Sequence, residues 1–363
     1  MAILNARSPK FVSIDNANMS YAVLKLYIWS GAKTSPPTEF IYEINKSPLT
    51  NSTKVSFEIA ELVRDELDTI FDGNYYGQAV WSKADIVAYN STNTSIETST
   101  ETFTSFDGYE YFEYPTSPEV PLMITNRELF VLDGSKFSIP IYTGVAPTVI
   151  LFKNGVVVST YVYTVEPESI DQIEYIEFED IDKIEVYVNS ILVDTVNIKS
   201  LNECLYIPKK ITFINKFGVL QDMYFFKKST EKIAVKRESY KANIINQNNT
   251  YSTYEHVNRD FNITAQESTT LSSGFLNEEY NEVFKQMMLS EKIWVTNILD
   301  APVWDKDFNL WDLNQNTWNY QNEQILPINV KTSNIEYKTS LNDRLVEYTF
   351  DFDNSFNVIN NIR

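Results

Sequence analysis

The sequence predicts a mainly β protein made of several β-sandwich domains, with one or two amphipathic helices packed on the sheets. Short runs rich in β-branched and aromatic residues recur along the chain, and turn-forming residues separate them. Aromatic residues reach 14% of the composition and glycine supplies only 9 of 363 residues, which excludes low-complexity disorder. Because a chain of this length exceeds the size at which one hydrophobic core usually keeps growing, more than one domain is expected.

Residues 1–118 are predicted to form an N-terminal β domain with one helix. Its strands are expected at residues 11–14, 21–31, 38–45, 54–62, 78–90 and 109–115. Apolar residues from Ile59 to Phe71 keep nearly helical spacing, which predicts an amphipathic helix over residues 58–71. Residues 91–105 are rich in Ser and Thr and are expected to form a long exposed hairpin loop.

Prolines at positions 115, 118 and 121 mark a boundary, after which residues 119–199 are predicted to form a small Ig-like β-sandwich. Asn154-Gly155 lies between two apolar runs, and this dipeptide favours a two-residue type I′ hairpin because both turn residues need positive φ. A second hairpin is expected around Asn189-Ser190. Several strands, no strong helical pattern and the short length together favour the sandwich.

Residues 200–363 are predicted to form a C-terminal α+β domain. Strands are expected on both sides of Gly218 within residues 209–229, and also at 254–268, 292–298, 327–339 and 345–353. A helix is predicted over residues 278–290, with Asn277 as its N-cap. Its apolar face carries Tyr280, Val283, Phe284, Met287 and Met288, and this face is expected to pack on the sheet of the same domain.

The formal net charge is −19, from 30 basic and 49 acidic residues, which argues against a nucleic-acid-binding surface because such surfaces neutralise phosphates with Lys and Arg. The single cysteine, Cys204, cannot form an internal disulfide, and one histidine, His256, leaves almost no ligands for zinc or heme. No apolar run approaches the roughly 18 residues of a membrane span, and no signal peptide is evident. We therefore expect a soluble protein made in the cytoplasm, without a metal or cofactor.

The C-terminal stretch EYTFDFD alternates apolar and polar residues, which predicts a strand that is buried on one face. Its acidic residues Glu347, Asp351 and Asp353 could form a catalytic pair, a metal site or a solvated face. Residues two apart on a strand lie roughly 6.6–6.8 Å apart, which overlaps the carboxylate separation of an inverting glycosidase. A catalytic acid needs burial or a like-charged neighbour, whereas the polar face of an antiparallel strand usually meets water, so the solvated face is favoured.

A denser acidic run comprises Glu166, Glu168, Asp171, Glu174, Glu177, Glu179, Asp180, Asp182 and Glu185. Such carboxylates could hold calcium, but the EF-hand pattern with its central glycine is missing. Acidic residues alternating with isoleucines are typical of a half-exposed strand, so a charged surface is favoured and calcium binding stays open.

No motif for nucleophilic catalysis or phosphate binding occurs in the sequence. The sequence contains no Gly-x-Ser-x-Gly motif whose serine could act with His256 as a general base. Cys204 has apolar neighbours, which is typical of a packed thiol. Neither a P-loop nor a Gly-x-Gly-x-x-Gly motif is present. The protein is therefore predicted not to be an enzyme, and no catalytic residue is assigned.

Trp304, Trp311 and Trp318 recur every seven residues in a polar stretch, and Asp or Asn follows each of them. They could form a local hydrophobic cluster under an extended loop, anchor a partner protein, or stack on sugar rings. Tryptophan is the commonest hot-spot residue of protein interfaces, so a protein contact is favoured over a sugar site. The three tryptophans are candidate interface residues.

Three segments of the C-terminal half carry a resemblance to a known family: ITFINKFGVLQDMYFFKKS at 211–229, NEEYNEVFKQMMLSEKIWV at 277–295 and YKTSLNDRLVEYTFDFDNSFNVINNIR at 337–363. Together they resemble the C-terminal half of virion structural proteins of tailed bacteriophages, particularly crAss-like and related phages. The family pattern has a β-rich N-terminal region, a strand-turn-strand with Asn, Gly and paired Phe, a helix, and a last strand that closes on INNIR. The resemblance covers residues 200–363 well and the first 200 only in general character, and the tryptophan-rich stretch departs from it.

The resemblance implies a non-enzymatic subunit of an oligomeric ring in the phage tail, in the hub, baseplate or head-tail connector region, which lines or surrounds the DNA exit path. Its partners are then further copies of the chain and other virion proteins, and Arg363, at the end of INNIR, becomes a fourth candidate interface residue. Acidic walls would let exported DNA slide past by repulsion. The alternative is a carbohydrate-binding or receptor-binding β protein, and a third reading, a glycoside hydrolase, requires a buried pair of carboxylates.

Overall fold

The computed structural model describes residues 2–77, 79–112, 121–164, 172–201, 205–298, 323–336 and 345–358. Most elements in these residues are β-strands, arranged in several sheets, and two are α-helices, which confirms the predicted mainly β, multi-domain sandwich fold.

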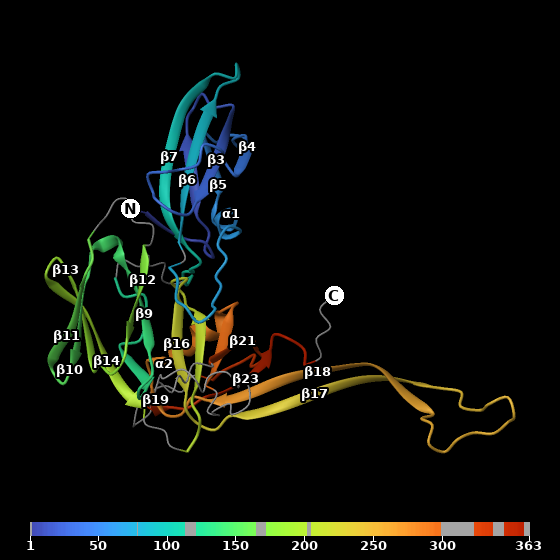
Figure 1. The fold of residues 1–363 in the computed structure, drawn as a ribbon. Coiled ribbons are helices and arrows are strands. Elements are labelled where there is room, and N and C mark those ends of the chain that lie inside the picture. The colour runs from blue at the N-terminus through green and yellow to red at the C-terminus, as the bar shows by residue number, and fades with distance from the viewer. Residues whose placement is uncertain are drawn as a thin grey trace, which may run out of the picture. The chain divides into compact units, whose positions relative to one another are not determined.

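Two compact units make up the chain (Figure 1). The first comprises Met1–Asn202, Thr212–Tyr224 and Glu279–Glu291, and the second comprises Glu203–Ile211, Phe225–Glu278 and Lys292–Arg363. The domain boundaries predicted near residues 118 and 199 stay a prediction, and both lie within the first unit.

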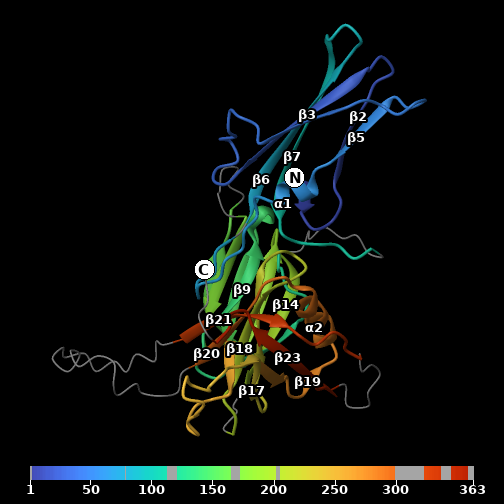
Figure 2. The same ribbon diagram turned by 90° about the vertical axis from the view of Figure 1, so that its right-hand side faces the viewer.

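Strands from the first 106 residues form a five-stranded sheet and a separate two-stranded ribbon. The sheet contains, in spatial order, β1 (Ala2–Asn5), β7 (Ser95–Phe106), β6 (Val80–Tyr89), β3 (Tyr21–Trp29) and β4 (Tyr42–Lys46). The ribbon pairs β2 (Phe11–Asp15) with β5 (Lys54–Glu58), and Figure 2 shows it beside β3. Leu24 and Phe103 of the sheet and Val12 and Phe57 of the ribbon share one hydrophobic core.

Residues 91–105 are not the exposed loop that their composition predicted. Ser95–Phe106 is strand β7, which pairs with β6 over almost its whole length. Threonine is β-branched and fits a pleated surface, so the Ser/Thr-rich composition is compatible with a strand. Only residues 90–94 make the turn, in which the Asn90 side-chain oxygen accepts the N–H groups of Thr92 and Thr94 at 3.0 Å.

Helix α1 (Ala60–Arg64) is much shorter than the helix predicted over residues 58–71. After Arg64 the N–H groups of Glu66 and Leu67 bond to carbonyls three residues earlier, and the helix ends there. Phe71 is nevertheless buried, with its ring 5.2 Å from that of Tyr75. The apolar spacing therefore reflected burial of this segment rather than a continuous helix.

The strand predicted at residues 109–115 is also wrong for the residues that are described, because Tyr109–Phe112 lie outside the named strands. Their rings instead receive cations: the Arg7 guanidinium lies 5.2 Å from the Tyr109 ring, and the Lys285 ammonium lies 3.6 Å from the Tyr111 ring. The aromatic residues Tyr109 and Tyr111 therefore make cation–π contacts instead of belonging to a sheet.

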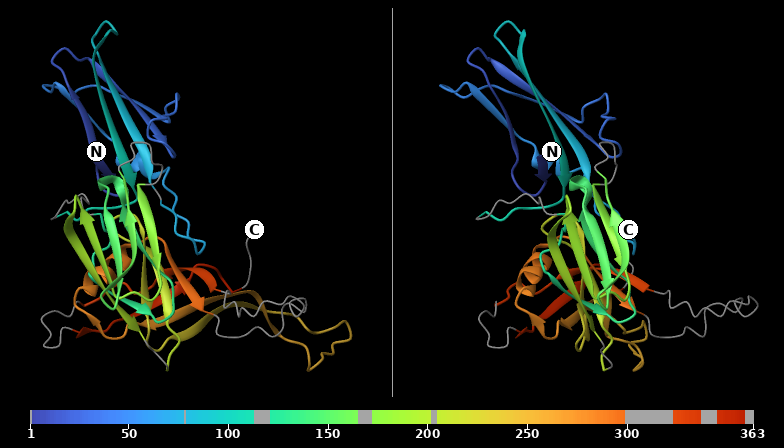
Figure 3. Two further views of the ribbon diagram at one scale, coloured as in Figure 1. Left: turned by 60° about the vertical axis from the view of Figure 1, so that its left-hand side comes forward. Right: turned by 90° about the vertical axis from the view of Figure 1, so that its left-hand side faces the viewer.

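Residues 121–164 and 172–201 form a sandwich of two sheets (Figure 3). The larger sheet contains β11 (Val156–Val162), β10 (Thr148–Lys153), β13 (Lys183–Val188), β14 (Ile191–Leu201) and β8 (Glu128–Leu132), in spatial order. The smaller pairs β12 (Ile173–Phe178) with β9 (Phe137–Tyr142), and the short 3-10 helix η1 (Thr143–Val145) follows β9. Val149 and Ile184 of the larger sheet meet Ile139 and Ile176 of the smaller in one core.

These seven described strands equal the number in an Ig constant-type domain, but they divide five and two rather than four and three. Both predicted hairpins are confirmed. Asn154 and Gly155 have φ of 50° and 75°, and Asn189 and Ser190 have φ of 51° and 65°, as a type I′ turn requires.

Helix α2 (Tyr280–Leu289) confirms the helix predicted over residues 278–290. The buried residues of its predicted face are Tyr280, Val283, Phe284 and Met287. The helix belongs to the first unit, where the Tyr280 ring lies 5.7 Å from that of Phe130 and the Tyr280 hydroxyl accepts the Phe130 N–H. The sequence predicted that this helix packs on a sheet of residues 200–363, and its contact with Phe130 was not predicted. Asn277 is not the N-cap, because it lies in β19 (Leu276–Asn277) and Glu279 takes that position.

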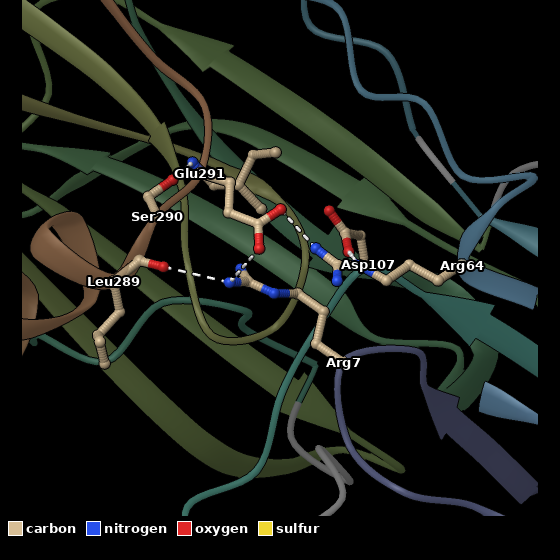
Figure 4. A network of polar contacts seen from close by, with 7 residues as sticks. Arg7, Arg64, Asp107, Leu289, Ser290 and Glu291 are labelled. Carbon is tan, nitrogen blue, oxygen red and sulfur yellow. Dashed lines mark hydrogen bonds and ion pairs between the residues drawn. The ribbon is translucent and has the colours of Figure 1, made fainter. Parts of the chain in front are cut away.

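An ion-pair network within the first unit holds the C-terminal end of α2. Arg7 donates to the Leu289 carbonyl at 3.2 Å and to Glu291 at 3.3 Å (Figure 4). Glu291 also pairs with Arg64 of α1, and Arg64 Nε lies 3.6 Å from an Asp107 carboxylate oxygen. Because the last carbonyls of a helix lack partners within it, the Arg7 guanidinium satisfies one of them and opposes the negative end of the helix dipole.

A seven-stranded sheet has the order β16-β15-β20-β21-β23-β18-β17. Its strands are β15 (Lys209–Ile214), β16 (Leu220–Phe225), β17 (Thr230–Lys241), β18 (Asn258–Ser272), β20 (Ile293–Ile298), β21 (Glu323–Val330) and β23 (Thr349–Asn354). β22 (Leu345–Val346) pairs separately with β19. The two strands predicted around Gly218 are therefore confirmed, as is the strand predicted at 292–298. The single strand predicted at 345–353 is instead two, β22 and β23, with Glu347 and Tyr348 outside both. β17 was not predicted.

Candidate assembly surface

Strands β17 and β18 form a ribbon, here called the arm, which continues beyond the other strands of the second unit (Figure 1). β18 pairs with β23 only from Ser268 to Ser272, whereas it pairs with β17 as far out as Asn258. Every residue of β17 is exposed. A two-stranded ribbon is marginally stable by itself in water, so an arm of this length is a candidate for contact with another molecule.

A β-bulge bends the arm halfway along. Lys236 pairs with Thr264 and Glu238 pairs with Phe261, so two residues of β18, Asn262 and Ile263, face one residue of β17. Asn262 has φ of 51°, a left-handed conformation that asparagine tolerates better than most residues. Bulges increase strand twist and turn the chain, so this position sets the direction of the outer half of the arm.

The tip of the arm, residues 242–257, is ordered by its own hydrogen bonds. The Ala242 N–H donates to the Val257 carbonyl at 2.7 Å, and the Asn246 N–H donates to the Thr250 carbonyl at 3.0 Å. The side-chain oxygen of Asn246 in turn accepts the N–H groups of Asn248 and Thr250 at 3.0 and 3.1 Å. The backbone of the tip therefore forms a defined loop, which Figure 3 shows in gold at the end of the arm.

Large apolar side chains are exposed along the whole arm. Tyr254, Tyr251 and Ile245 at the tip are 84%, 66% and 58% exposed. The exposed apolar residues of the strands are Ile233, Val235, Tyr240, Phe261 and Ile263, and the Tyr240 and Phe261 rings lie 5.9 Å apart. Single exposed apolar residues are ordinary, but a series on one protruding element is typical of an interaction surface.

The edge of the arm is basic. Between residues 227 and 241, six basic residues, Lys227, Lys228, Lys232, Lys236, Arg237 and Lys241, outnumber two acidic ones, Glu231 and Glu238. The whole chain has the opposite balance, with a net charge of −19. Lysines on an exposed edge strand hinder indiscriminate strand pairing, and they also select an acidic partner.

The four interface residues predicted from the sequence, Trp304, Trp311, Trp318 and Arg363, lie outside the described residues, and so does Cys204. They stay predictions. His256 lies in the tip of the arm, where it is exposed and its carbonyl accepts the Arg259 Nε–H at 3.3 Å.

Asp351 and Asp353 lie on the half-exposed face of β23, as predicted, while Phe350 and Phe352 are buried, and Glu347 lies just before this strand. Each carboxylate has a partner of its own. Asp351 accepts the Thr270 hydroxyl at 2.5 Å, Asp353 pairs with Lys331 at 3.1 Å, and Glu347 accepts the Ser272 hydroxyl at 2.9 Å. This arrangement favours the solvated face over a catalytic pair.

Asp222 is the only buried carboxylate among the described residues. Its two oxygens accept the Tyr75 hydroxyl at 2.5 Å and the Thr212 hydroxyl at 2.7 Å. Burial, followed by the charge of Asp222, raises the pKa of Tyr75 well above its usual range, so the phenol keeps its proton. A glycosidase needs two carboxylates around the scissile bond, and this cluster offers one.

The acidic run at residues 166–185 is only partly described, because Glu166, Glu168 and Asp171 lie outside the described residues. Asp180 and Asp182 pair with Lys153, and hydrogen bonds from Lys183 and Tyr187 lower the pKa of Glu185. Across the described part of the chain, no three His, Cys, Asp or Glu side chains come together as a metal site. Calcium binding gains no support from these contacts.

Comparisons with known proteins do not assign a family. No family model and no curated protein matches the sequence. The crystal structure of CBD12 from CALX1.2 is similar over 51% of this chain and 76% of its own length, with 12% identical residues and a TM-score of 0.19, too low to carry an argument. Neither described helix has the length and hydropathy needed to cross a bilayer.

Proposed function

We propose that this chain is a non-enzymatic structural subunit of a tailed-phage virion, which assembles with further copies of itself into a ring in the tail or head-tail connector. The observation that carries the assembly role is the arm, with an edge strand exposed at every residue and apolar side chains along its length. The virion assignment rests on the resemblance of residues 211–229, 277–295 and 337–363 to phage structural proteins.

The chemistry of the arm fits a protein partner. The cores of protein interfaces are enriched in aromatic residues and arginine, and the arm offers Tyr240, Tyr251, Tyr254, Phe261 and Arg237. Its edge strand also offers backbone N–H and C=O groups to a partner strand, which is a common mode of recognition. The partners we propose are other copies of the chain and neighbouring virion proteins.

The acidity of the chain fits a position around a DNA exit path. A surface with a net charge of −19 repels phosphates, so DNA would pass without binding. Synthesis in the host cytoplasm followed by incorporation into the virion completes the proposal.

The second candidate function is a carbohydrate-binding or receptor-binding protein. Tyr251 and Tyr254 favour it, because exposed tyrosines on a protruding loop can stack on sugar rings. The same residues serve a protein interface equally well, so an experiment must separate the two functions.

Light scattering during size-exclusion chromatography tests the proposal. A ring subunit elutes as a large oligomer or associates with other virion proteins, and its melting temperature does not change with glycans. A monomer whose melting temperature rises with a glycan from the host surface would contradict the ring and support the second candidate.

A further inference from the structure

Resting on the ring function proposed above, we infer that the arm of one copy docks on the acidic first unit of a second copy, so that subunits join head to tail through the basic edge of β17. The inference names the partner of the arm and the polarity of the contact. It follows from the distribution of charge over the two units, from the alternation of side chains on β17 and from the symmetry that each possible contact would impose.

Charge is segregated within this chain. The first unit carries 15 basic and 32 acidic residues, a formal charge of −17, and the second carries 15 basic and 17 acidic residues, a formal charge of −2. The basic residues of the second unit concentrate between residues 227 and 241, where the formal charge is +4. A second copy therefore offers this basic edge a strongly acidic surface, and complementary charge steers association and fixes orientation.

Side chains alternate on β17 in a way that suits such a contact. Lys232 and Lys236 share one face with Ala234, and Ile233 and Val235 lie on the other, because successive residues of a strand point to opposite faces. The ribbon thus has a basic face and an apolar face over the same segment. A strand added at this edge would meet exposed lysines on one side and exposed apolar side chains on the other.

Symmetry separates this contact from its obvious competitor, the pairing of two β17 edges around a twofold axis. In a twofold contact the same patch faces itself, so two copies of a segment with a formal charge of +4 would be brought together. Like charges across an interface are unfavourable. A contact between the arm and a different, acidic surface avoids this repulsion and is heterologous, the type of contact that closes into rings.

A pair of matched variants tests the role of the basic edge. Lys232→Glu with Lys236→Glu reverses two exposed charges of β17, and Lys54→Glu with Lys136→Glu makes the same change in net charge at exposed positions of the first unit. We expect the arm variant to raise the subunit concentration at half-assembly at least about tenfold and the control to leave it unchanged or lower it. Equal effects in the two variants, or none in either while the wild type assembles, would overturn the inference and leave the ring function standing.

Mixing the arm variant with wild-type chain tests the polarity. A head-to-tail contact leaves the acidic surface of the variant intact, so fluorescently labelled variant should enter wild-type assemblies. It should enter less readily than labelled wild type, because its own arm no longer docks on the acidic surface. A twofold contact between arms would bring the new Glu side chains against the lysines of the wild type, so the variant would associate with wild-type chain more strongly than the wild type does with itself, and that result would contradict the inference.

Zero-length crosslinking of carboxylates to amines, in a mixture of isotopically light and heavy chains, then locates the contact. We expect links between copies from Lys232, Lys236 or Lys241 to carboxylates of the first unit. Links from arm to arm would overturn the inference. Retention of the wild type, but not of the arm variant, on double-stranded DNA or heparin without self-association would also overturn it, because the arm would then serve a phosphate polymer.

Discussion

Arg7 lies where the last turn of α2 leaves carbonyl groups without partners inside the helix. Its guanidinium bonds to Leu289 and Glu291 and lies over the Tyr109 ring, so one side chain links residues that are far apart in the sequence. Nothing local in the sequence marks this role, because a single arginine after a short strand has many possible partners. Only the folded chain brings Glu291 next to it.

Replacing Arg7 with alanine is expected to lower the free energy of unfolding by about 1–2 kcal/mol, since the substitution removes a partner of the helix C-terminus and a charge that opposes its dipole. Arg7→Lys should recover part of the loss, because it restores the charge but not the two-pronged geometry. Urea denaturation of both variants measures the difference. Lys54→Ala, at an exposed position of β5, is the control and should change stability by less than about 0.5 kcal/mol.

Glu185 provides a pH-dependent test at the same scale. It accepts hydrogen bonds from Lys183 at 2.8 Å and Tyr187 at 2.7 Å. In the folded protein these bonds lower the pKa of Glu185 below its ordinary value of 4.5. The stabilisation is fully present above the pKa of the unfolded chain and is lost as pH falls through the lower, folded pKa. The stability difference between wild type and Glu185→Gln should therefore shrink as pH falls below about 4.5. A difference that grows towards acid pH would contradict this assignment.

At the scale of single elements, sequence patterns predicted what local chemistry determines. Asn154-Gly155 and Asn189-Ser190 gave hairpins because the turn conformation depends on the two residues that form it. The alternation of Phe350 and Phe352 with acidic residues predicted a strand correctly, because successive residues of a strand point to opposite faces. Such features need no knowledge of the rest of the chain.

Elements whose state depends on distant partners were predicted less well. β7 was taken for a loop because its Ser/Thr composition resembles a linker, although its pairing with β6 makes it a strand. The alternating run EKIAVKRESYK at 231–241 carries a strand signal for β17 that could have been read from the sequence. The protrusion of β17 from the sheet could not have been read from the sequence. It depends on the fact that β23 pairs with β18 only from Ser268 to Ser272.

Gly218 and Gly155 form a matched pair of turn glycines, with φ of 77° and 75°. A Cβ at Gly218 would lie 2.5 Å from backbone atoms of Asp107 and Gly108, whereas a Cβ at Gly155 would meet nothing within 4 Å. Gly155→Ala should cost about 1–2 kcal/mol for the left-handed backbone alone. Gly218→Ala should cost about 2–5 kcal/mol, because the segment that contains Gly108 must also move. Similar melting temperatures for the two variants would contradict the close backbone approach.

Helix α2 offers the corresponding test of packing. Phe284 is fully buried, so Phe284→Ala should reduce stability by about 3–5 kcal/mol through lost burial and the cavity left behind. Leu289→Ala, on the same helix but 47% exposed, serves as the control and should cost less than about 1 kcal/mol. Thermal unfolding of the two variants measures both. If Phe284→Ala melts within a degree or two of the wild type, α2 is not part of the core.

Considered as a whole, the molecule combines closed cores with an arm that contributes little to any of them. The buried residues cluster in the sandwich layers and under α2, while β17 contributes none and the outer half of β18 contributes none beyond Ala265. The conformational entropy lost on ordering such an arm is offset only weakly within one copy. An arm of this kind is therefore expected to gain its stabilisation from contact with another molecule.

Removing the tip of the arm tests this expectation for the whole protein. Lys241 and Asn258 are paired across the ribbon, so residues 242–257 can be replaced by an Asn-Gly turn of type I′. No residue of the tip is buried, and the melting temperature should stay within about 2 °C of the wild type. Self-association should weaken at least about tenfold, because Ile245, Tyr251 and Tyr254 are the largest exposed apolar side chains of the loop and side chains of this kind dominate interface energies.

The variant Tyr251→Ser with Tyr254→Ser keeps the length of the loop and separates the loss of aromatic contacts from the loss of the loop itself. In a ring subunit it should behave like the truncated chain in light scattering. In a glycan-binding protein, both variants would stay monomeric like the wild type and would lose a glycan-dependent rise in melting temperature. A truncated chain that assembles as well as the wild type would exclude the tip from the subunit contact and confine that contact to the strands of the arm.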